Sequence, residues 1–449
     1  MSLALRLNRA VTGAIIVAGA LVAFPLTASA TKVERIVTPG GIEAWMVHEP
    51  SVPLIALDFA FKGGADQDPP ERAGTASMAT SLLDEGAGDL DSNTFHEQVE
   101  AKAIELNFSA TRDYVSGSMR TLTENRDDAV RLLKLALTAP RFEPDDVERI
   151  RAQMLSVIRR AATAPNEIAS ERWWAQAFPG HPYGRSQRGT LASVQEITPG
   201  DLKDFAHRVF ARDNLKVGIV GNIDAATAAA LIDGVFGSLP AKATLTPVAA
   251  AVPQALGDKV SVDLDVPQSV MIIGGPGIMR KDPDFMAAYV LNHILGGSPF
   301  SSRLYKQVRE ARGLAYSVYS TVYPLDHAAL FMTSTATRFD RAKETLDVIE
   351  AEVRKMAETG PTQDELDKAK SFLTGSYALR FDSSAKIAEQ LVGLQLEDLG
   401  IDYIDKRNSL VNAVTLDDVK RVARRLLDNR MLVTVVGKPQ PLPATAKGG

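Results

Sequence analysis

The chain has 449 residues, of which 23% are charged and 45% are hydrophobic, and its formal net charge is −5. These values are typical of a globular protein with two or three domains, and they exclude a largely disordered, collagenous or coiled-coil chain. The mild acidity does not favour nucleic-acid binding, and the lack of cysteine excludes disulfides, thiolate zinc sites and iron–sulfur clusters.

The N-terminal segment has the residue order of a secretory signal peptide. Two arginines come first, residues 10–26 are largely apolar, and Ala28 and Ala30 place small side chains at the cleavage positions. We therefore expect residues 1–30 to be a signal peptide that is cleaved after Ala30, which makes the mature chain periplasmic. An uncleaved membrane anchor is the alternative, because the apolar stretch approaches the length that spans a bilayer.

Periodicity in the first half predicts strands that alternate with helices. Residues 54–61 form a predicted strand, and residues 145–160 form a predicted amphipathic helix. His181 follows in a predicted loop, where we expect its side chain to face solvent because no second metal ligand lies nearby in the sequence.

The second half repeats the order of the first. Residues 197–221 are echoed by residues 414–437, and each copy is a helix start followed by an apolar strand that ends in glycine. Thr198 and Thr415 are placed to cap these helices, each with an acidic residue three positions later. A repeat of this length indicates a duplicated domain rather than a solenoid.

The two copies are separated by residues 239–258, which are rich in Pro, Ala and Thr and predict an extended linker. We therefore predict an N-terminal domain at residues 31–238 and a C-terminal domain at residues 259–449. Strands such as 270–274 and helices such as 364–377 alternate within each half. The predicted fold class is α+β, with helices packed on an antiparallel or mixed sheet.

A helix followed by a strand is predicted within residues 296–320. Leu304, Val308 and Ala311 recur at helical spacing and would be buried on one face. Gly313 would end this helix, and the strand would follow directly.

Arg309 and Tyr316 are the residues of this segment that could do chemistry. The first would lie in the last helical turn and the second early in the strand, so their side chains could meet. A fixed cation and a phenolic hydroxyl can together hold a carbonyl oxygen as it becomes an oxyanion. The alternative is an arginine that neutralises the helix dipole beside a half-buried tyrosine.

The sequence Arg-Leu-Tyr-Lys-Gln-Val-Arg-Glu-Ala-Arg-Gly-Leu-Ala-Tyr-Ser-Val at residues 303–318 resembles the C-terminal signature of the insulinase/pitrilysin-type zinc peptidases, which include mitochondrial processing peptidase. The resemblance extends to residues 178–185, to Gly189 and to residues 214–221, and it covers nearly all of the mature chain. It implies two homologous α+β domains that form one half of a clamshell, with a second such pair enclosing an unfolded peptide.

The resemblance also implies that the zinc motif is degenerate in this chain. Active members carry HxxEH on the first helix, and the matching positions here hold Ser77 and Ser81 in place of histidine and Thr80 in place of glutamate. The position of the distal glutamate ligand falls near Ser156 or Val157, and neither side chain binds zinc well. We therefore expect no metal in this chain and zinc in a partner subunit.

The arginine/tyrosine pair, by contrast, is retained with the family's spacing of seven residues. The resemblance implies that Arg309 and Tyr316 face a partner's zinc site and hold the scissile carbonyl, with Gly296 and Gly297 near the substrate path. The chain would then be the non-zinc subunit of an exported heterodimeric metallopeptidase, inactive alone. Its partners would be an HxxEH-bearing subunit and an unfolded peptide.

A second hypothesis is a catalytically inactive clamshell that captures peptides or scaffolds a complex. Hydrolysis by this chain alone is disfavoured, because the missing ligands leave no way to activate a water molecule.

Overall fold

The computed structural model describes residues 32–438, and residues from Val33 onward belong to one compact unit. The predicted signal peptide and its cleavage after Ala30 lie outside the described residues. None of the helices in residues 32–438 is both long enough and apolar enough to cross a membrane.

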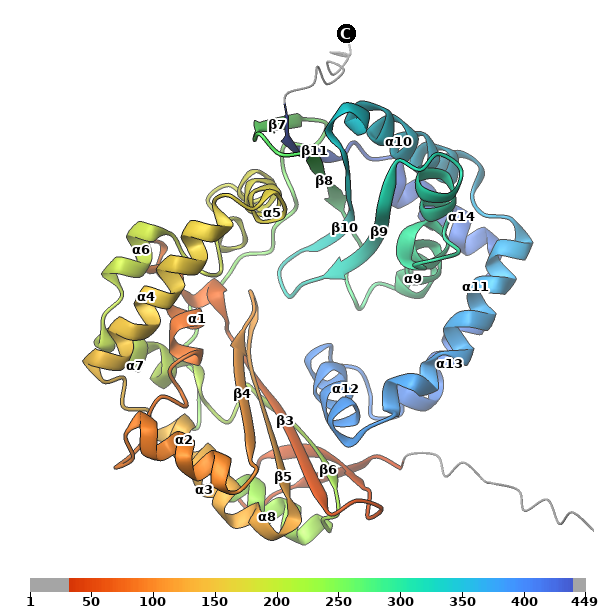
Figure 1. The fold of residues 1–449 in the computed structure, drawn as a ribbon. Helices are drawn as coiled ribbons and strands as arrows, with labels where there is room; N and C mark the ends of the chain where they lie inside the picture. Colours follow the sequence, from red (N-terminus) through yellow and green to blue (C-terminus); the bar gives the residue numbers. More distant parts are fainter. Residues whose placement is uncertain (1–31, 439–449) are drawn as a thin grey trace, which may run out of the picture. The chain divides into compact units, whose positions relative to one another are not determined.

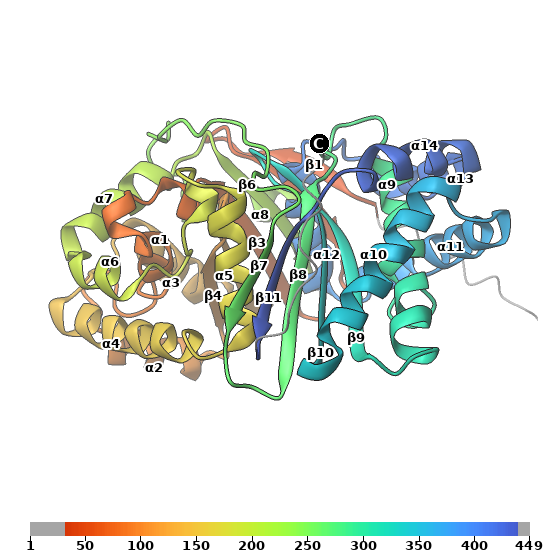
Figure 2. The same ribbon diagram turned by 90° about the horizontal axis from the view of Figure 1, so that it is seen from above.

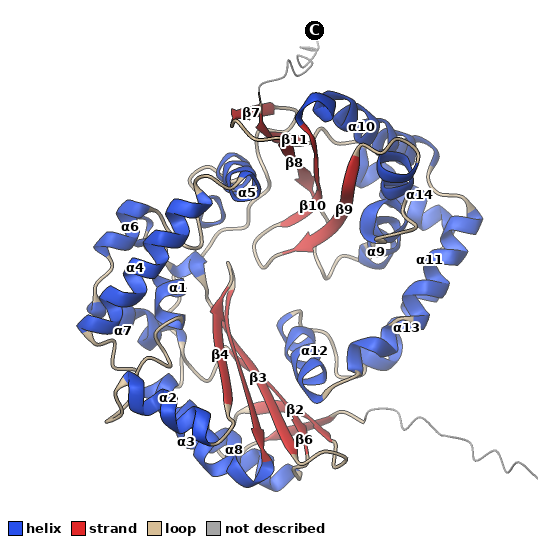
Figure 3. Ribbon diagram, viewed as in Figure 1, coloured by secondary structure: helices blue, strands red, loops and turns tan. Residues whose placement is uncertain are grey.

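The strands of the described residues form two sheets (Figure 3). The strands are β1 (Glu34–Val37), β2 (Glu43–His48), β3 (Leu54–Lys62), β4 (Glu105–Ala110), β5 (Tyr114–Leu122), β6 (Leu215–Gly221), β7 (Lys259–Asp263), β8 (Gln268–Pro276), β9 (Ala315–Pro324), β10 (Ala329–Arg338) and β11 (Leu432–Gly437). The first sheet has the order β1-β2-β6-β3-β5-β4, and the second has the order β7-β11-β8-β10-β9.

The helices alternate with these strands along the chain. The α-helices are α1 (Thr75–Thr80), α2 (Ser92–Ala101), α3 (Arg126–Thr138), α4 (Pro144–Ala161), α5 (Pro165–Ala177), α6 (Leu191–Glu196), α7 (Pro199–Val209), α8 (Ala225–Phe236), α9 (Phe285–Asn292), α10 (Ala342–Thr359), α11 (Gln363–Gly375), α12 (Ser384–Leu396), α13 (Tyr403–Ala413) and α14 (Leu416–Leu427). Two π-helical segments span His293–Gly297 and Tyr305–Glu310. Short 3-10 helices span Ala65–Gln67, Pro70–Arg72, Thr123–Asn125, Pro182–Gly184, Phe339–Arg341 and Tyr377–Phe381.

The two sheets repeat one another strand for strand, apart from β1, which extends the first sheet only. β2 pairs in parallel with β6, as β7 does with β11. The remaining neighbours are antiparallel in both sheets. Thr198 and Thr415 each form a capping box with the acidic residue three positions later, Asp201 or Asp418. The α+β fold and the duplicated domain that the sequence predicts are therefore confirmed.

Each sheet has one face covered by helices of its own half, because the side chains on that face of the central strands are apolar. In the first half, Phe59 and Phe61 of β3 pack against Phe236 of α8, with ring centroids 5.2 and 6.4 Å apart. In the second half, α14 is buried through Val419, Val422, Ala423, Leu426 and Leu427, at helical spacing.

The other face of each sheet is covered by a helix from the opposite half (Figures 1 and 2). Helix α5 lies on β8 and β11, where the indole N–H of Trp173 donates a hydrogen bond to the carbonyl oxygen of Leu432 at 3.2 Å. Helix α12 lies on β3 and β6, where the side-chain amide of Gln395 donates to the carbonyl oxygen of Val217 at 2.9 Å. The two halves thus exchange equivalent helices.

A glycine in each sheet makes these close approaches possible. A Cβ at Gly274 would lie 2.5 Å from Cζ2 of Trp173, and a Cβ at Gly218 would lie 2.6 Å from the carbonyl oxygen of Ala388. Both distances are shorter than van der Waals contact, so any side chain there would push the covering helix away.

Residues 239–258 contain no helix or strand, and backbone hydrogen bonds hold them against both halves. The amide of Thr244 donates to the carbonyl oxygen of Arg208 at 2.8 Å, and that of Thr246 donates to the side-chain oxygen of Gln67 at 2.7 Å. The amide of Ala251 donates to the carbonyl oxygen of His327 at 2.7 Å. This extended segment is therefore fixed in position.

Candidate functional site

The degenerate zinc motif lies on α1, a short helix that begins at a strained glycine. Gly74 has φ of 102°, which favours glycine, and the carboxylate of Asp68 accepts hydrogen bonds from the amides of Gly74 and Ala76 at 2.8 and 2.9 Å. Burial raises the pKa of Asp68 to about 7, although these two amides oppose the shift. Helix α1 is thus held firmly at its N-terminus.

The three motif side chains, on α1 and at its C-cap, donate hydrogen bonds to main-chain carbonyl groups. Ser77 Oγ donates to the carbonyl oxygen of Gln187 at 2.8 Å, Thr80 Oγ1 to that of Ala76 at 3.0 Å, and Ser81 Oγ to that of Ser77 at 2.9 Å. Neutral hydroxyls in this arrangement supply neither a zinc ligand of the usual kind nor a carboxylate base. The residues at this position therefore do not fit the metal that the family resemblance implies.

The positions matched to the distal zinc ligand lie on the exposed side of α4. Ser156 and Val157 both face solvent, and Val157 is 39% exposed. A serine and a valine at this place cannot complete a zinc site.

Arg309 and Tyr316 meet where the predicted turn brings them together. Arg309 lies in the last turn of the π-helical segment Tyr305–Glu310, Gly313 follows with φ of 58°, and Tyr316 lies at the start of edge strand β9. The guanidinium carbon of Arg309 is 4.3 Å from the ring centroid of Tyr316 and 5.1 Å from that of Tyr305. These are cation–π contacts, and they fix the direction of the guanidinium.

Both polar groups of this pair are open to a ligand. The side chain of Tyr316 is 81% exposed. Within residues 32–438, neither the guanidinium of Arg309 nor the hydroxyl of Tyr316 has a hydrogen-bond or ion-pair partner, so their donors remain available for an external oxygen atom.

The segment before this pair differs from the prediction in one respect. Leu304 and Val308 are fully buried, as helical spacing predicts, but Ala311 is exposed. The amide of Ala311 donates to the carbonyl oxygen of Lys306, five residues earlier, so the turn is wider than in an α-helix and Ala311 is carried off the buried face.

Gly296 and Gly297 lie at the end of the π-helical segment His293–Gly297. A Cβ at Gly296 would be 2.4 Å from the hydroxyl oxygen of Ser320 on β9, and a Cβ at Gly297 would be 2.7 Å from the side-chain nitrogen of Asn292. Close packing accounts for both glycines, and their proximity to a substrate remains a prediction.

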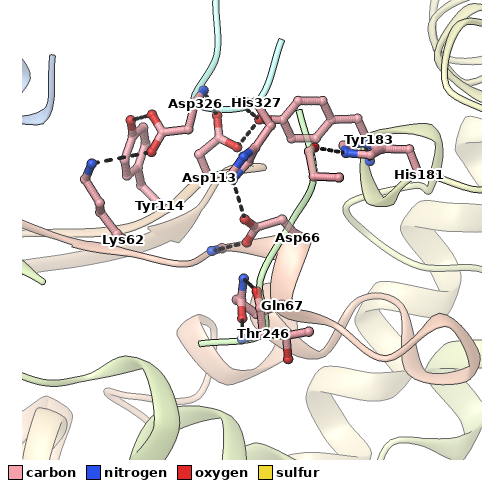
Figure 4. Close-up of polar contacts among 12 residues, drawn as sticks. Lys62, Asp66, Gln67, Asp113, Tyr114, His181, Tyr183, Thr246, Asp326 and His327 are labelled. Carbon is pink, nitrogen blue, oxygen red and sulfur yellow. Dashed lines mark hydrogen bonds and ion pairs between the residues drawn. The ribbon is translucent and has the colours of Figure 1, made fainter. Parts of the chain in front are cut away.

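A second polar cluster joins the two halves at the turn between β9 and β10 (Figure 4). Asp66, Asp113 and His327 offer ligand atoms within 4.8 Å of one another, a separation at which a metal ion could be held after a small adjustment. Burial raises the pKa of both Asp66 and Asp113. Because these three residues are far apart in the sequence, the sequence alone did not predict this cluster.

The carboxylates of this cluster already have protein partners. Asp113 accepts hydrogen bonds from the hydroxyl of Tyr183 and, at 3.1 Å, from the amide of Asp326. Asp66 accepts from the amide of Gly64 at 2.9 Å, and its other oxygen is 3.8 Å from Nε2 of His327. The cluster therefore links the turn to the first half without a further ligand.

The prediction that His181 faces solvent is wrong. Its ring is half-buried, Nε2 is 3.0 Å from the carbonyl oxygen of Ala249, and Nδ1 accepts a hydrogen bond from the amide of Tyr183 at 3.1 Å. The linker folds back over this loop, which sequence spacing alone did not reveal.

Two family models match most of this chain. Residues 45–191 match the family model of insulinase (peptidase family M16), and residues 196–373 match that of the peptidase M16 inactive domain. The chain belongs to the M16 peptidase family. With serine and threonine in place of the zinc motif, it falls among the inactive members of that family.

Relatives of the M16 family extend over most of the chain. An uncharacterized zinc protease of Streptomyces coelicolor is 28% identical over 90% of this chain and 89% of its own length. The non-peptidase homolog YmxG of Helicobacter pylori is 29% identical over 73% of this chain and 76% of its own length. A solved M16 inactive domain from Pseudomonas fluorescens, 28% identical, matches 92% of this chain and all of its own chain with a TM-score of 0.86.

Proposed function

We propose that this chain is the non-zinc subunit of an exported heterodimeric zinc metallopeptidase. The observation that carries the proposal is the geometry of Arg309 and Tyr316, a cation stacked on an exposed phenol with both sets of donors free. Such a pair suits a carbonyl oxygen that gains negative charge when a peptide bond is attacked. The zinc and the catalytic carboxylate would belong to a partner of the same family that carries HxxEH.

In this proposal the chain's own residues bind and orient the substrate. The Arg309 guanidinium and the Tyr316 hydroxyl hold the scissile carbonyl oxygen, and both are positioned before the substrate arrives. Strand β9 is an edge strand of the second sheet, so an extended peptide can pair with its backbone beside Tyr316. Periplasmic location is part of the proposal, supported by the charge and apolar pattern of residues 1–30.

The test is cleavage of an unstructured fluorogenic peptide by this chain mixed with an exported HxxEH-bearing relative. We expect activity only in the mixture, and we expect Arg309→Ala or Tyr316→Phe to lower kcat/KM about 10²- to 10³-fold. Arg312→Ala is the matched control, because its exposed guanidinium bonds to Gln307 and to no other residue within 32–438. Full activity of both pair variants in the complex would contradict the proposal.

A second candidate function is peptide capture or scaffolding without catalysis. The name of the Helicobacter pylori relative, a non-peptidase homolog, favours this candidate, as do the hydroxyl side chains at the zinc-motif positions. Partner activity that is unchanged by addition of this chain would support it.

A further inference from the structure

The degenerate zinc motif borders a pocket that contains several arginines. This arginine pocket, about 330 Å³ in volume, is lined by Ser77, Arg112, Glu167, Trp174, Arg185 and Arg188 among others. A larger sheet pocket of about 580 Å³ adjoins it, since Arg112 and Trp174 line both, and its floor includes Ile272, Tyr319, Met332 and Thr333 of the second sheet. A charged pocket therefore opens onto a broad surface of mixed polarity.

Arg112 is a half-buried cation without a carboxylate partner in the described part of the chain. Its guanidinium carbon lies 3.5 Å from the ring centroid of Trp174, and its Nε donates to the carbonyl oxygen of Tyr183 at 3.4 Å. Burial lowers the pKa of Arg112 to about 10. The neighbouring carboxylate of Asp113 is already bonded to Tyr183 and to the amide of Asp326. The phenol of Tyr323 also interacts with this guanidinium, so the remaining N–H donors of Arg112 are those available to a ligand.

Arg185 is in a similar position across the arginine pocket. Its Nε is buried without a hydrogen-bond partner, and no ion pair to this guanidinium occurs within residues 32–438. Burial lowers the pKa of Arg185, and the charges of Asp68, Asp66 and Glu71 oppose that shift. A buried N–H group without an acceptor costs free energy, and an anion beside the guanidinium of Arg185 would offset the cost of burying its charge.

The acidic residues of the pocket do not neutralise these two arginines. Glu167 pairs with Arg188 at 2.7 Å, and Glu171 accepts a hydrogen bond from Ser186 at 3.0 Å. Among the residues that line the pocket, three arginines against Glu167 and Glu171 leave one net positive charge. This balance suits a carboxylate, which carries a single charge, better than a doubly charged phosphate.

We propose that the arginine pocket binds the carboxylate of a peptide, held by the guanidinium groups of Arg112 and Arg185. The preceding residues of the peptide lie in the sheet pocket, where Ile272 and Met332 contact apolar side chains. The inference rests on the proposed function only in that the ligand is a peptide. It gives the degenerate motif region a binding role that needs no metal.

The test measures binding of a fluorescein-labelled hexapeptide ending in Ala-Leu-Phe to the purified chain by fluorescence anisotropy. Three forms are compared: the free C-terminal acid, the C-terminal amide, and an amide in which glutamate replaces the last residue. We expect a carboxylate-bearing form to bind about tenfold or more tightly than the plain amide, because hydrogen bonds to a charged group are strong. Preference for the free acid identifies the chain terminus as the source, and equal binding of the glutamate form identifies a side chain.

Two variants and a control locate the effect. Arg112→Gln and Arg185→Gln should each remove most of the preference for the carboxylate, so that the ratio of acid to amide affinity falls about tenfold towards one. Arg212→Gln is the matched control, because its Nε is also buried without a partner but the residue lies outside the pocket. A folding defect would weaken all peptides together, so the ratio of acid to amide affinity separates a binding role from a structural one.

The inference is overturned if neither carboxylate-bearing peptide binds the wild-type chain more tightly than the plain amide, or if both variants keep the full preference. These outcomes are independent of the cleavage assay, which depends on Arg309 and Tyr316. Carboxylate preference without activity in any mixture would retain this inference and refute the catalytic proposal.

Discussion

Substitution of Gly218 tests the exchange of helices between the two halves. A Cβ at this position of β6 would lie 2.6 Å from the carbonyl oxygen of Ala388 and 3.0 Å from Cβ of Leu391, both on α12. The nearest atom belongs to the helix backbone, so a rotamer change cannot relieve the clash. Overpacking of this kind typically costs about 1–3 kcal/mol, and we expect Gly218→Ala to lower the free energy of unfolding by that amount.

Gly393→Ala is a matched control within the same contact. Gly393 lies in α12 itself, but no atom is within 4 Å of its Cβ position, so the substitution adds a methyl group to open space. Alanine favours a helix over glycine by about 0.8–1 kcal/mol, so this variant should be more stable than the wild type. Both substitutions replace glycine by alanine, and they should change the free energy of unfolding in opposite directions.

The assay is urea unfolding followed by tryptophan fluorescence, because Trp45 is buried between β2 and α12 and reports on this contact. A decrease of about 2 kcal/mol moves the urea midpoint by several tenths of a molar unit or more at a typical slope. If Gly218→Ala is as stable as the wild type with an unchanged slope, α12 does not pack on β6 at this distance, and the reasoning fails.

Two further predictions concern single side chains. Burial, reinforced by the charge of Glu389, raises the pKa of Asp58 on β3 to about 7, so ionisation opposes folding. The contribution of Asp58 to stability should therefore fall as pH rises from about 4 to about 7 and level off above it. Asp58→Asn should make this slope shallower in urea titrations at several pH values, with the remainder due to groups such as Asp68. Thr415→Ala removes the cap of α14 and should cost about 1 kcal/mol in the same assay. The pKa of Asp418, lowered to about 2 chiefly by its hydrogen bond to Thr415, should rise measurably by NMR, and an unchanged value would refute the capping role.

The local features of this fold were accessible from sequence, because short-range rules govern them. The caps at Thr198 and Thr415 and the turn at Gly313 follow from residue types at fixed spacing. The repeat predicted the duplicated domain, since each copy carries the same helix start and strand.

The contacts between the halves were not accessible in this way. The buried residues of α5 and α12 have the same apolar periodicity whether they cover their own sheet or the other one, so the exchange leaves no local signal. The pocket at Arg112 and Arg185 also leaves no local signal, since its walls come from separate segments of the first half. Hydroxyl residues at the zinc positions, by contrast, were informative because ligand chemistry is tied to residue type.

The helix exchange also dictates an order of events during synthesis. One apolar face of the first sheet is covered by α12, which begins at Ser384. The residues of this face are Trp45, Val47, Ala56 and Val220. A nascent chain that has been synthesised only as far as the second sheet therefore still exposes this apolar surface. A chain of this design has to be kept unfolded, or shielded by a chaperone, until nearly its whole length is available for folding.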